Sequence, residues 1–140
     1  MRSSYAYILA AVLGYLVAHT IKYFLQPKHK RTWKRWVQTG NFPSSHTAVV
    51  VALVTAIFVH EGVSTLFAVA GVFAAITIQD ALSSRRSIGE QGTVLSKLLE
   101  KVTPGEPAPY VAIGHTLKEV VAGAAIGVVL GVVVALFITI

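Results

Sequence analysis

The sequence predicts an all-α integral membrane protein: a bundle of four transmembrane helices, with a short cytoplasmic amphipathic helix between the third and the fourth. Hydrophobic residues make up 54% of the 140 residues and charged residues only 13%, a balance typical of membrane proteins. Four continuous apolar runs approach the length of about 20 residues that spans a bilayer. The net charge of +6 is concentrated between these runs, as the positive-inside rule describes, so no nucleic-acid partner is expected.

The first apolar run covers residues 5–25. It is too long for the hydrophobic region of a secretory signal and lacks a small-residue cleavage site, so we expect a retained transmembrane helix. Lys22 lies near its end, where the side chain is expected to snorkel toward the membrane surface. His19, one turn earlier, is expected to be an interfacial polar residue.

The next two runs, residues 44–60 and 65–82, are separated by a tight turn and are expected to form a transmembrane hairpin. The last run, residues 117–140, carries glycines at every fourth position, which share one helix face and let another helix approach closely. The partner helix could belong to this chain or to a second copy, and a second copy would make the protein a homo-oligomer. The glycines of this ridge are Gly123, Gly127 and Gly131.

A polar segment, Ser83–Lys101, separates the third run from the fourth. Its apolar residues recur at helical spacing and its charged residues occupy the other face, which predicts an amphipathic helix lying in the membrane interface. Three prolines then make residues 103–109 a loop. All 140 residues are expected to form a single membrane domain.

The distribution of cations predicts the orientation. Nearly all of them lie in residues 28–35 and 83–118, and the opposite side carries little besides Arg2 and Glu61. Basic segments stay in the cytoplasm, so we expect a multi-pass protein of the cell (plasma or inner) membrane with both termini outside. The sequence contains no cysteine, which excludes disulfides and zinc–thiolate sites.

This topology gathers polar and ionisable residues at the cytoplasmic ends of the helices. Two histidines, nearby cations and free N–H groups at a helix start can carry out phosphoryl transfer through a phosphohistidine. One imidazole attacks phosphorus, and the other protonates the leaving oxygen. A cation of the basic segment, such as Lys28 or Arg35, could also contact the phosphate. The residues that would form the site are Ser44, Ser45, His46, Asp80, Arg85, Arg86, His115 and Glu119.

A purely structural interpretation stays open for the same residues. Thr116 and Glu119 have the spacing of a capping box, in which the glutamate bonds the backbone at the helix start. Asp80 with Arg85 or Arg86 can be an interfacial ion pair. A proton or ion pathway is less favoured, because the polar residues stop at one end of the helices instead of crossing the bilayer.

Three ordered motifs resemble a known family. Residues 43–46, Pro-Ser-Ser-His, resemble the PSGH motif of the type-2 phosphatidic acid phosphatase superfamily, which also includes the vanadium haloperoxidases. His115-x-x-x-Glu119 and the glycine-spaced helix after it resemble that superfamily's final HxxxD motif. Between them, Asp80-Ala81, Arg85-Arg86 and Gly89-Glu90-Gln91 match the pattern of the divergent branch of the superfamily.

The resemblance implies a membrane phosphatase, independent of metal or other cofactors, that hydrolyses a lipid or isoprenoid phosphate or diphosphate in the bilayer. It makes His115 the nucleophile, Glu119 the carboxylate that orients it and His46 the general acid. The residues implied in phosphate binding are Ser44, Ser45, Arg85, Arg86, Lys28 and Arg35, with Asp80 and Gln91 as accessory residues.

The chain departs from the superfamily pattern at several points. Lys28 and Arg35 meet the KxxxxxxRP motif only loosely, with Trp36 in place of proline. Pro109 stands where an arginine is expected six residues before the nucleophile, so Arg85 or Arg86 would have to substitute for it. Glutamate replaces the usual aspartate, and four expected spans replace the usual six. A second interpretation therefore stays open: a lipid-phosphate-binding membrane protein or scaffold without turnover.

Overall fold

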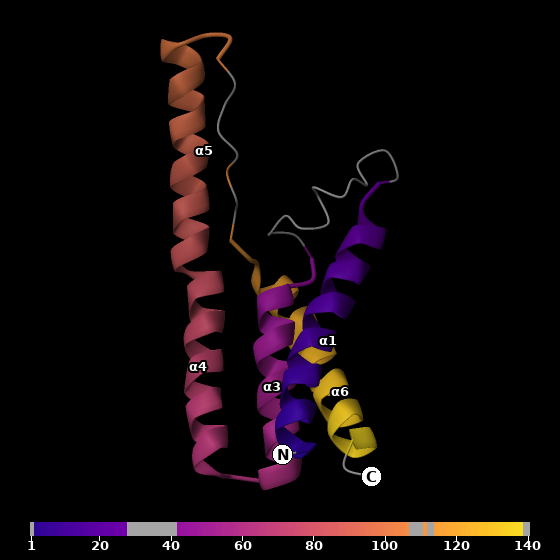
Figure 1. Cartoon of the computed structure of the whole chain (residues 1–140). Coiled ribbons are helices and arrows are strands. Elements are labelled where there is room, and N and C mark those ends of the chain that lie inside the picture. The colour runs from indigo at the N-terminus through magenta and orange to yellow at the C-terminus, as the bar shows by residue number, and fades with distance from the viewer. Residues whose placement is uncertain (1, 28–41, 107–110, 112–113, 139–140) are drawn as a thin grey trace.

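The computed structural model describes residues 2–27, 42–106, 111 and 114–138, and all regular secondary structure in these residues is helical (Figure 1). The prediction of an all-α protein is confirmed, and a helix occupies each expected apolar run. The helices are α1 (Arg2–Leu25), α3 (Ser45–Glu61), α4 (Thr65–Leu82), α5 (Ser84–Val102) and α6 (Leu117–Ile138).

Within the described residues, three helical stretches are long and apolar enough to cross a membrane: Ser4–Leu25, Thr65–Val102 and Leu117–Phe137. Helix α3 is apolar as well, but its 17 residues are slightly fewer than the roughly 20 that cross a bilayer at right angles. Large apolar side chains such as those of Phe73 and Phe137 are exposed on the outside of the helices, where lipid would cover them. The described part of the chain is therefore a helical bundle of the membrane type.

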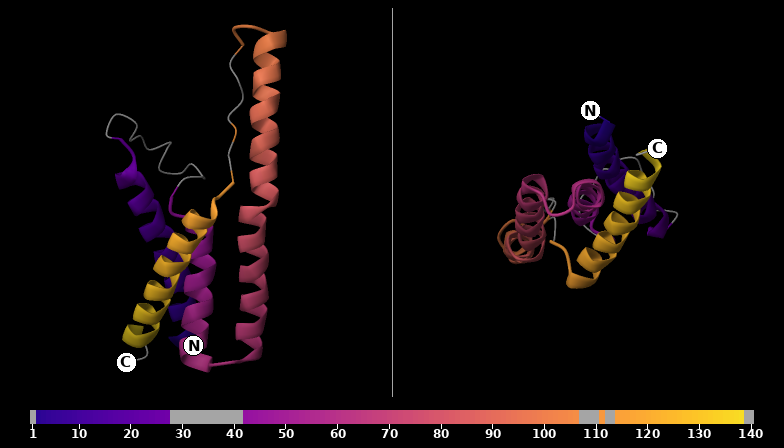
Figure 2. Two further views of the ribbon diagram at one scale, coloured as in Figure 1. Left: turned by 180° about the vertical axis from the view of Figure 1, so that it is seen from behind. Right: turned by 90° about the horizontal axis from the view of Figure 1, so that it is seen from below.

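Helix α3 lies at the centre of the bundle and packs against α1, α4 and α6. The N-terminus, the C-terminus and the turn between α3 and α4 lie at one end of the bundle (Figures 1 and 2). Gly62 makes this turn with a φ of 63°, and the Ser64 hydroxyl accepts the Phe67 N–H to begin α4. At the opposite end α1 and α4 finish and α3 and α6 begin, so the residues of the candidate site converge there.

The glycine ridge of α6 packs against α3. A Cβ at Gly123 would fall directly against the Ser44 carbonyl oxygen, and a Cβ at Gly127 would lie 2.8 Å from the Ala48 carbonyl oxygen. A Cβ at Gly14 of α1 would also lie 2.8 Å from the Ala48 oxygen, so α1 and α6 both approach α3 closely at this carbonyl. The partner of the ridge is thus a helix of the same chain. Association between copies stays a prediction, and it would have to use another surface.

Helix α5 differs from the expected interfacial helix in its direction. It continues the line of α4 and extends beyond the ends of α3 and α6 (Figures 1 and 2). The reason is local: Ser83 N–H donates to the Gln79 carbonyl (2.9 Å) and Ser87 N–H to the Ser83 carbonyl (2.9 Å), so helical hydrogen bonding passes through the junction. The helix is amphipathic as predicted, and its apolar residues Ile88, Leu95 and Leu98 are exposed.

Candidate functional site

The start of α3 has the geometry expected of an anion site. Ser44 caps the helix: its Oγ accepts bonds from the backbone N–H of Thr47 (3.4 Å) and from the Thr47 hydroxyl (2.9 Å). Ser44, Ser45 and Thr47 are buried, and His46 is half-buried. The N–H groups of Ser45 and His46, in the first turn, have no carbonyl partner within the helix. These two N–H groups can therefore bind an oxyanion at the helix start.

The start of α6 holds a buried histidine against a carboxylate. His115 is 4% exposed, and its Nδ1 lies 3.0 Å from Glu119 Oε2. A carboxylate only accepts hydrogen bonds, so Nδ1 carries a proton, and in the neutral ring Nε2 keeps its lone pair. The same oxygen accepts the Thr116 backbone N–H at 2.9 Å. Glu119 is therefore a helix cap and the partner of His115 at once, and the two interpretations of this residue are compatible.

Backbone contacts bring the start of α6 to the other parts of the site. Ser44 N–H donates to the Glu119 carbonyl (2.9 Å), which joins the starts of α3 and α6. His115 N–H donates to the Ala81 carbonyl at the end of α4 (3.0 Å). Gly114 packs directly on the backbone of Arg86, where any Cβ would clash. The two histidines and the α4–α5 junction are thus held at one end of the bundle.

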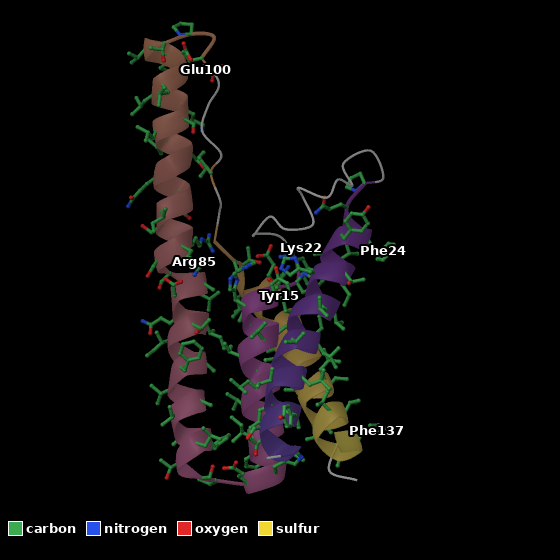
Figure 3. The ribbon with its side chains drawn as sticks, in the orientation of Figure 1. Tyr15, Lys22, Phe24, Arg85, Glu100 and Phe137 are labelled. Atoms are coloured by element: carbon green, nitrogen blue, oxygen red, sulfur yellow. The ribbon has the colours of Figure 1, made fainter. Side chains whose placement is uncertain are left out.

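Several cationic groups surround the half-buried imidazole of His46. Among the described residues, four charged or titratable side chains lie close enough to act on it: Arg85, His115, Lys22 and His19. Arg85 Nε donates to Asp80 Oδ2, which fixes the guanidinium at the α4–α5 junction. Figure 3 shows Arg85 at this junction and Lys22 on α1. Such a site, rich in donors and cations, is suited to an anion with several oxygen atoms, such as phosphate.

The comparisons with known proteins agree with the motifs. Residues 4–130 match the model of the Divergent PAP2 family. The chain belongs to this family. It is 35% identical to the uncharacterized membrane protein YuiD of Bacillus subtilis (strain 168), over 148 aligned positions that cover 93% of this chain and 94% of the relative. No solved structure matches the chain.

Two residues that were expected in the site of this Divergent PAP2 family member, Arg86 and Gln91, bond to other side chains of α5 instead. The Arg86 guanidinium pairs with Glu90 one turn further along α5 (3.1 Å), and both side chains are exposed. The Gln91 amide donates to the Ser87 hydroxyl (3.3 Å) on the exposed surface of the same helix. Lys28 and Arg35 lie outside the described residues. Among the described cations expected to bind phosphate, Arg85 is therefore the one close enough for its charge to act on His46.

The prediction that Lys22 snorkels to the membrane surface is wrong. Lys22 and His19 are 3% and 2% exposed, because α1 turns the face that carries them toward α3 and α6. The His19 ring packs on the Tyr15 ring, with centroids 4.1 Å apart. The signal was present in the sequence of this family member: Tyr15, His19 and Lys22 recur every three or four residues and share one helix face.

No group of three or more His, Cys, Asp or Glu residues in the described part of this family member could hold a metal ion. The carboxylates near the histidines already have partners: Glu119 bonds His115 and Thr116, and Asp80 bonds Arg85. The groups that remain available to bind a ligand in the site are therefore imidazoles, cations and backbone N–H groups.

Proposed function

We propose that the protein is a four-span membrane phosphatase that hydrolyses a lipid or isoprenoid phosphate, or diphosphate, through a phosphohistidine at His115. The observation that carries the proposal is the buried contact of 3.0 Å between His115 Nδ1 and Glu119 Oε2. It leaves Nε2 as the nucleophilic atom and places a negative charge behind the ring that becomes positive during attack. Membership of the Divergent PAP2 family supports the same class of chemistry.

In the proposed reaction, the lone pair of His115 Nε2 forms a bond to phosphorus while the bond between phosphorus and the leaving oxygen breaks. Protonated His46 gives its proton to that oxygen, so the lipid leaves as an alcohol or, from a diphosphate, as a monophosphate. Water then attacks phosphorus, the N–P bond breaks, and neutral His46 takes the proton of the water. The N–H groups at the start of α3 and the Arg85 guanidinium stabilise the charge on the phosphoryl oxygens.

The membrane arrangement is part of the proposal. Helix α3 is counted as the fourth span, and the site faces the cytoplasm because the cations gather at its end of the bundle. Lys22, Arg85 and Arg86 lie at this end, while Arg2 and Glu61 lie at the other. Both termini are then outside the cell, and the substrate is a lipid whose phosphate reaches the site from the cytoplasmic leaflet.

One observation favours a second candidate, a lipid-phosphate-binding protein without turnover. Glu119 Oε2 completes the cap of α6 through the Thr116 N–H, so the residue has a structural use that does not need catalysis. Arg85 is likewise neutralised in part by Asp80. This candidate shares the phosphate site with the phosphatase and differs only in lacking hydrolysis.

Release of inorganic phosphate from a panel of lipid and isoprenoid phosphates, by purified protein in detergent with EDTA, tests the proposal. We expect release by the wild type and none by His115→Ala. His60→Ala is the matched control, because His60 lies at the other end of the bundle, where its Nε2 contacts the Ala135 carbonyl oxygen (3.0 Å). Activity that EDTA abolishes and Mg²⁺ restores would refute the phosphohistidine mechanism.

A further inference from the structure

Lys22 is a buried cation near the end of α1. Its side chain is 3% exposed, and among the described residues its Nζ has no hydrogen-bond partner. A buried ammonium without hydrogen bonds destabilises a fold, so such a group is usually retained for a partner that arrives with a ligand. Lys22 points into the end of the bundle where α3 and α6 begin (Figure 3).

The buried side chain of Lys22 lies at the end of the bundle that carries the candidate site (Figure 3). Glu119 attracts it, and it acts in turn on the imidazole of His46. It therefore lies near the carboxylate behind His115 and near the first turn of α3. Glu119 Oε2 already bonds His115 and Thr116, and it gives Lys22 no hydrogen bond. No described residue accepts a hydrogen bond from the ammonium, which has three N–H donors to offer a ligand.

We propose that Lys22 binds the phosphate group of the substrate, on the side of the site opposite Arg85. This assignment rests on the proposed function and adds a second cation to the site beside Arg85. By sequence, Pro109 stands where the superfamily motif carries an arginine before the nucleophile, and the Arg86 side chain is held by Glu90. Lys22 reaches the site from a different helix, α1, and supplies a compact charge suited to a phosphoryl oxygen.

The variant Lys22→Met tests the assignment, because it keeps an apolar stem of similar length and removes the ammonium. In full-length protein purified in detergent, binding of orthovanadate and inorganic phosphate is measured from the rise in unfolding temperature with anion concentration. We expect anion affinity about 10- to 100-fold below that of the wild type, the range for losing a charged hydrogen-bond partner. Without anion, the unfolding temperature should be equal or higher, because a buried unpartnered charge is gone.

Two further variants serve as controls. Lys22→Arg keeps the charge and should retain most of the affinity. Lys101→Met removes a lysine from the exposed last turn of α5, far from the site, and should bind both anions as the wild type does. If Lys22→Met does not fold, Lys22→Gln replaces it, and the same loss of affinity is expected.

A structural role for Lys22 predicts the opposite pattern. If the ammonium only neutralises Glu119, Lys22→Met unfolds at a lower temperature and the folded variant binds both anions with wild-type affinity. That result overturns the assignment, and so does a wild-type protein that binds neither anion. The experiments distinguish a failure of the phosphatase proposal from a failure of the Lys22 proposal. Anion binding that depends on Lys22, without hydrolysis of any lipid phosphate, refutes the phosphatase proposal alone. Hydrolysis by the wild type, with undiminished anion affinity in Lys22→Met, refutes the role of Lys22 alone.

Discussion

Replacing Glu119 with glutamine separates its two uses, as a cap and as the partner of His115. Glutamine still offers a carbonyl oxygen to the Thr116 N–H, which Glu119 Oε2 now accepts at 2.9 Å, so the cap survives. It also still accepts the His115 Nδ1 proton. The substitution removes only the negative charge.

The charge lies 3.0 Å from the ring nitrogen that becomes part of a cation during attack on phosphorus. At an effective dielectric constant of about 20, a full charge pair at this distance is worth roughly 5 kcal/mol. A transition state with about half of that charge developed loses roughly 2–3 kcal/mol, which lowers kcat by about 10²-fold. Phosphate affinity and the unfolding temperature should change little in Glu119→Gln.

The assay compares kcat, measured as phosphate release, with the unfolding temperature for the same preparations. Glu119→Asp should keep more activity than Glu119→Gln, because the charge remains. Glu90→Gln is the matched control: it removes a carboxylate that pairs only with Arg86 on the exposed side of α5. Turnover of Glu119→Gln equal to that of the wild type would show that Glu119 acts only as a cap, and the lipid-phosphate binder would become the better candidate.

Three further predictions concern the membrane, the proton balance and the packing. A reporter that is active only outside the cytoplasm should be active after the C-terminus and silent within residues 103–109; the reverse pair inverts the proposed orientation. The pH–rate profile should be bell-shaped, since the nucleophilic histidine must be neutral while the acid histidine must be protonated; a profile flat from about pH 5 to 9 contradicts a mechanism that needs this pair. Gly123→Ala should destabilise the protein by about 1–3 kcal/mol, because its Cβ meets the Ser44 carbonyl, whereas Gly71→Ala, with open space around it, should be neutral or slightly stabilising; equal unfolding temperatures would contradict the close α3–α6 packing.

The parts of the site that could be predicted depend on local sequence. Ser44 precedes a long apolar run and caps it, as small hydroxyl residues do at helix starts. His115 and Glu119 are four residues apart around the start of α6, a spacing that can bring an imidazole and a carboxylate together whichever helices lie nearby. Consecutive spans cross the membrane in opposite directions, so the second and fourth predicted spans, α3 and α6, both begin at the same end of the bundle.

The parts that could not be predicted depend on contacts between distant segments. Lys22 is buried because α1 packs against α3 and α6; the spacing of Tyr15, His19 and Lys22 shows that they share one helix face, but not that other helices cover that face. The direction of α5 was not predictable either, because hydrogen bonding through Ser83 continues α4 into α5 where a bend into the membrane interface was expected. In both cases contacts that form only in the folded chain decide between arrangements that are equally compatible with the local pattern.

The length of α3 sets the depth at which a substrate would bind. Its 17 residues rise about 26 Å, less than the roughly 30 Å of a hydrocarbon layer. In the proposed four-span arrangement, with its far end at one surface, the α3 start lies just beneath the other surface, at the level where lipid headgroups join their chains. A phosphate bound there can stay attached to a chain that never leaves the bilayer. In that arrangement a water-soluble phosphate ester would have to descend below the surface to reach His115, so the short helix would favour substrates anchored in the membrane.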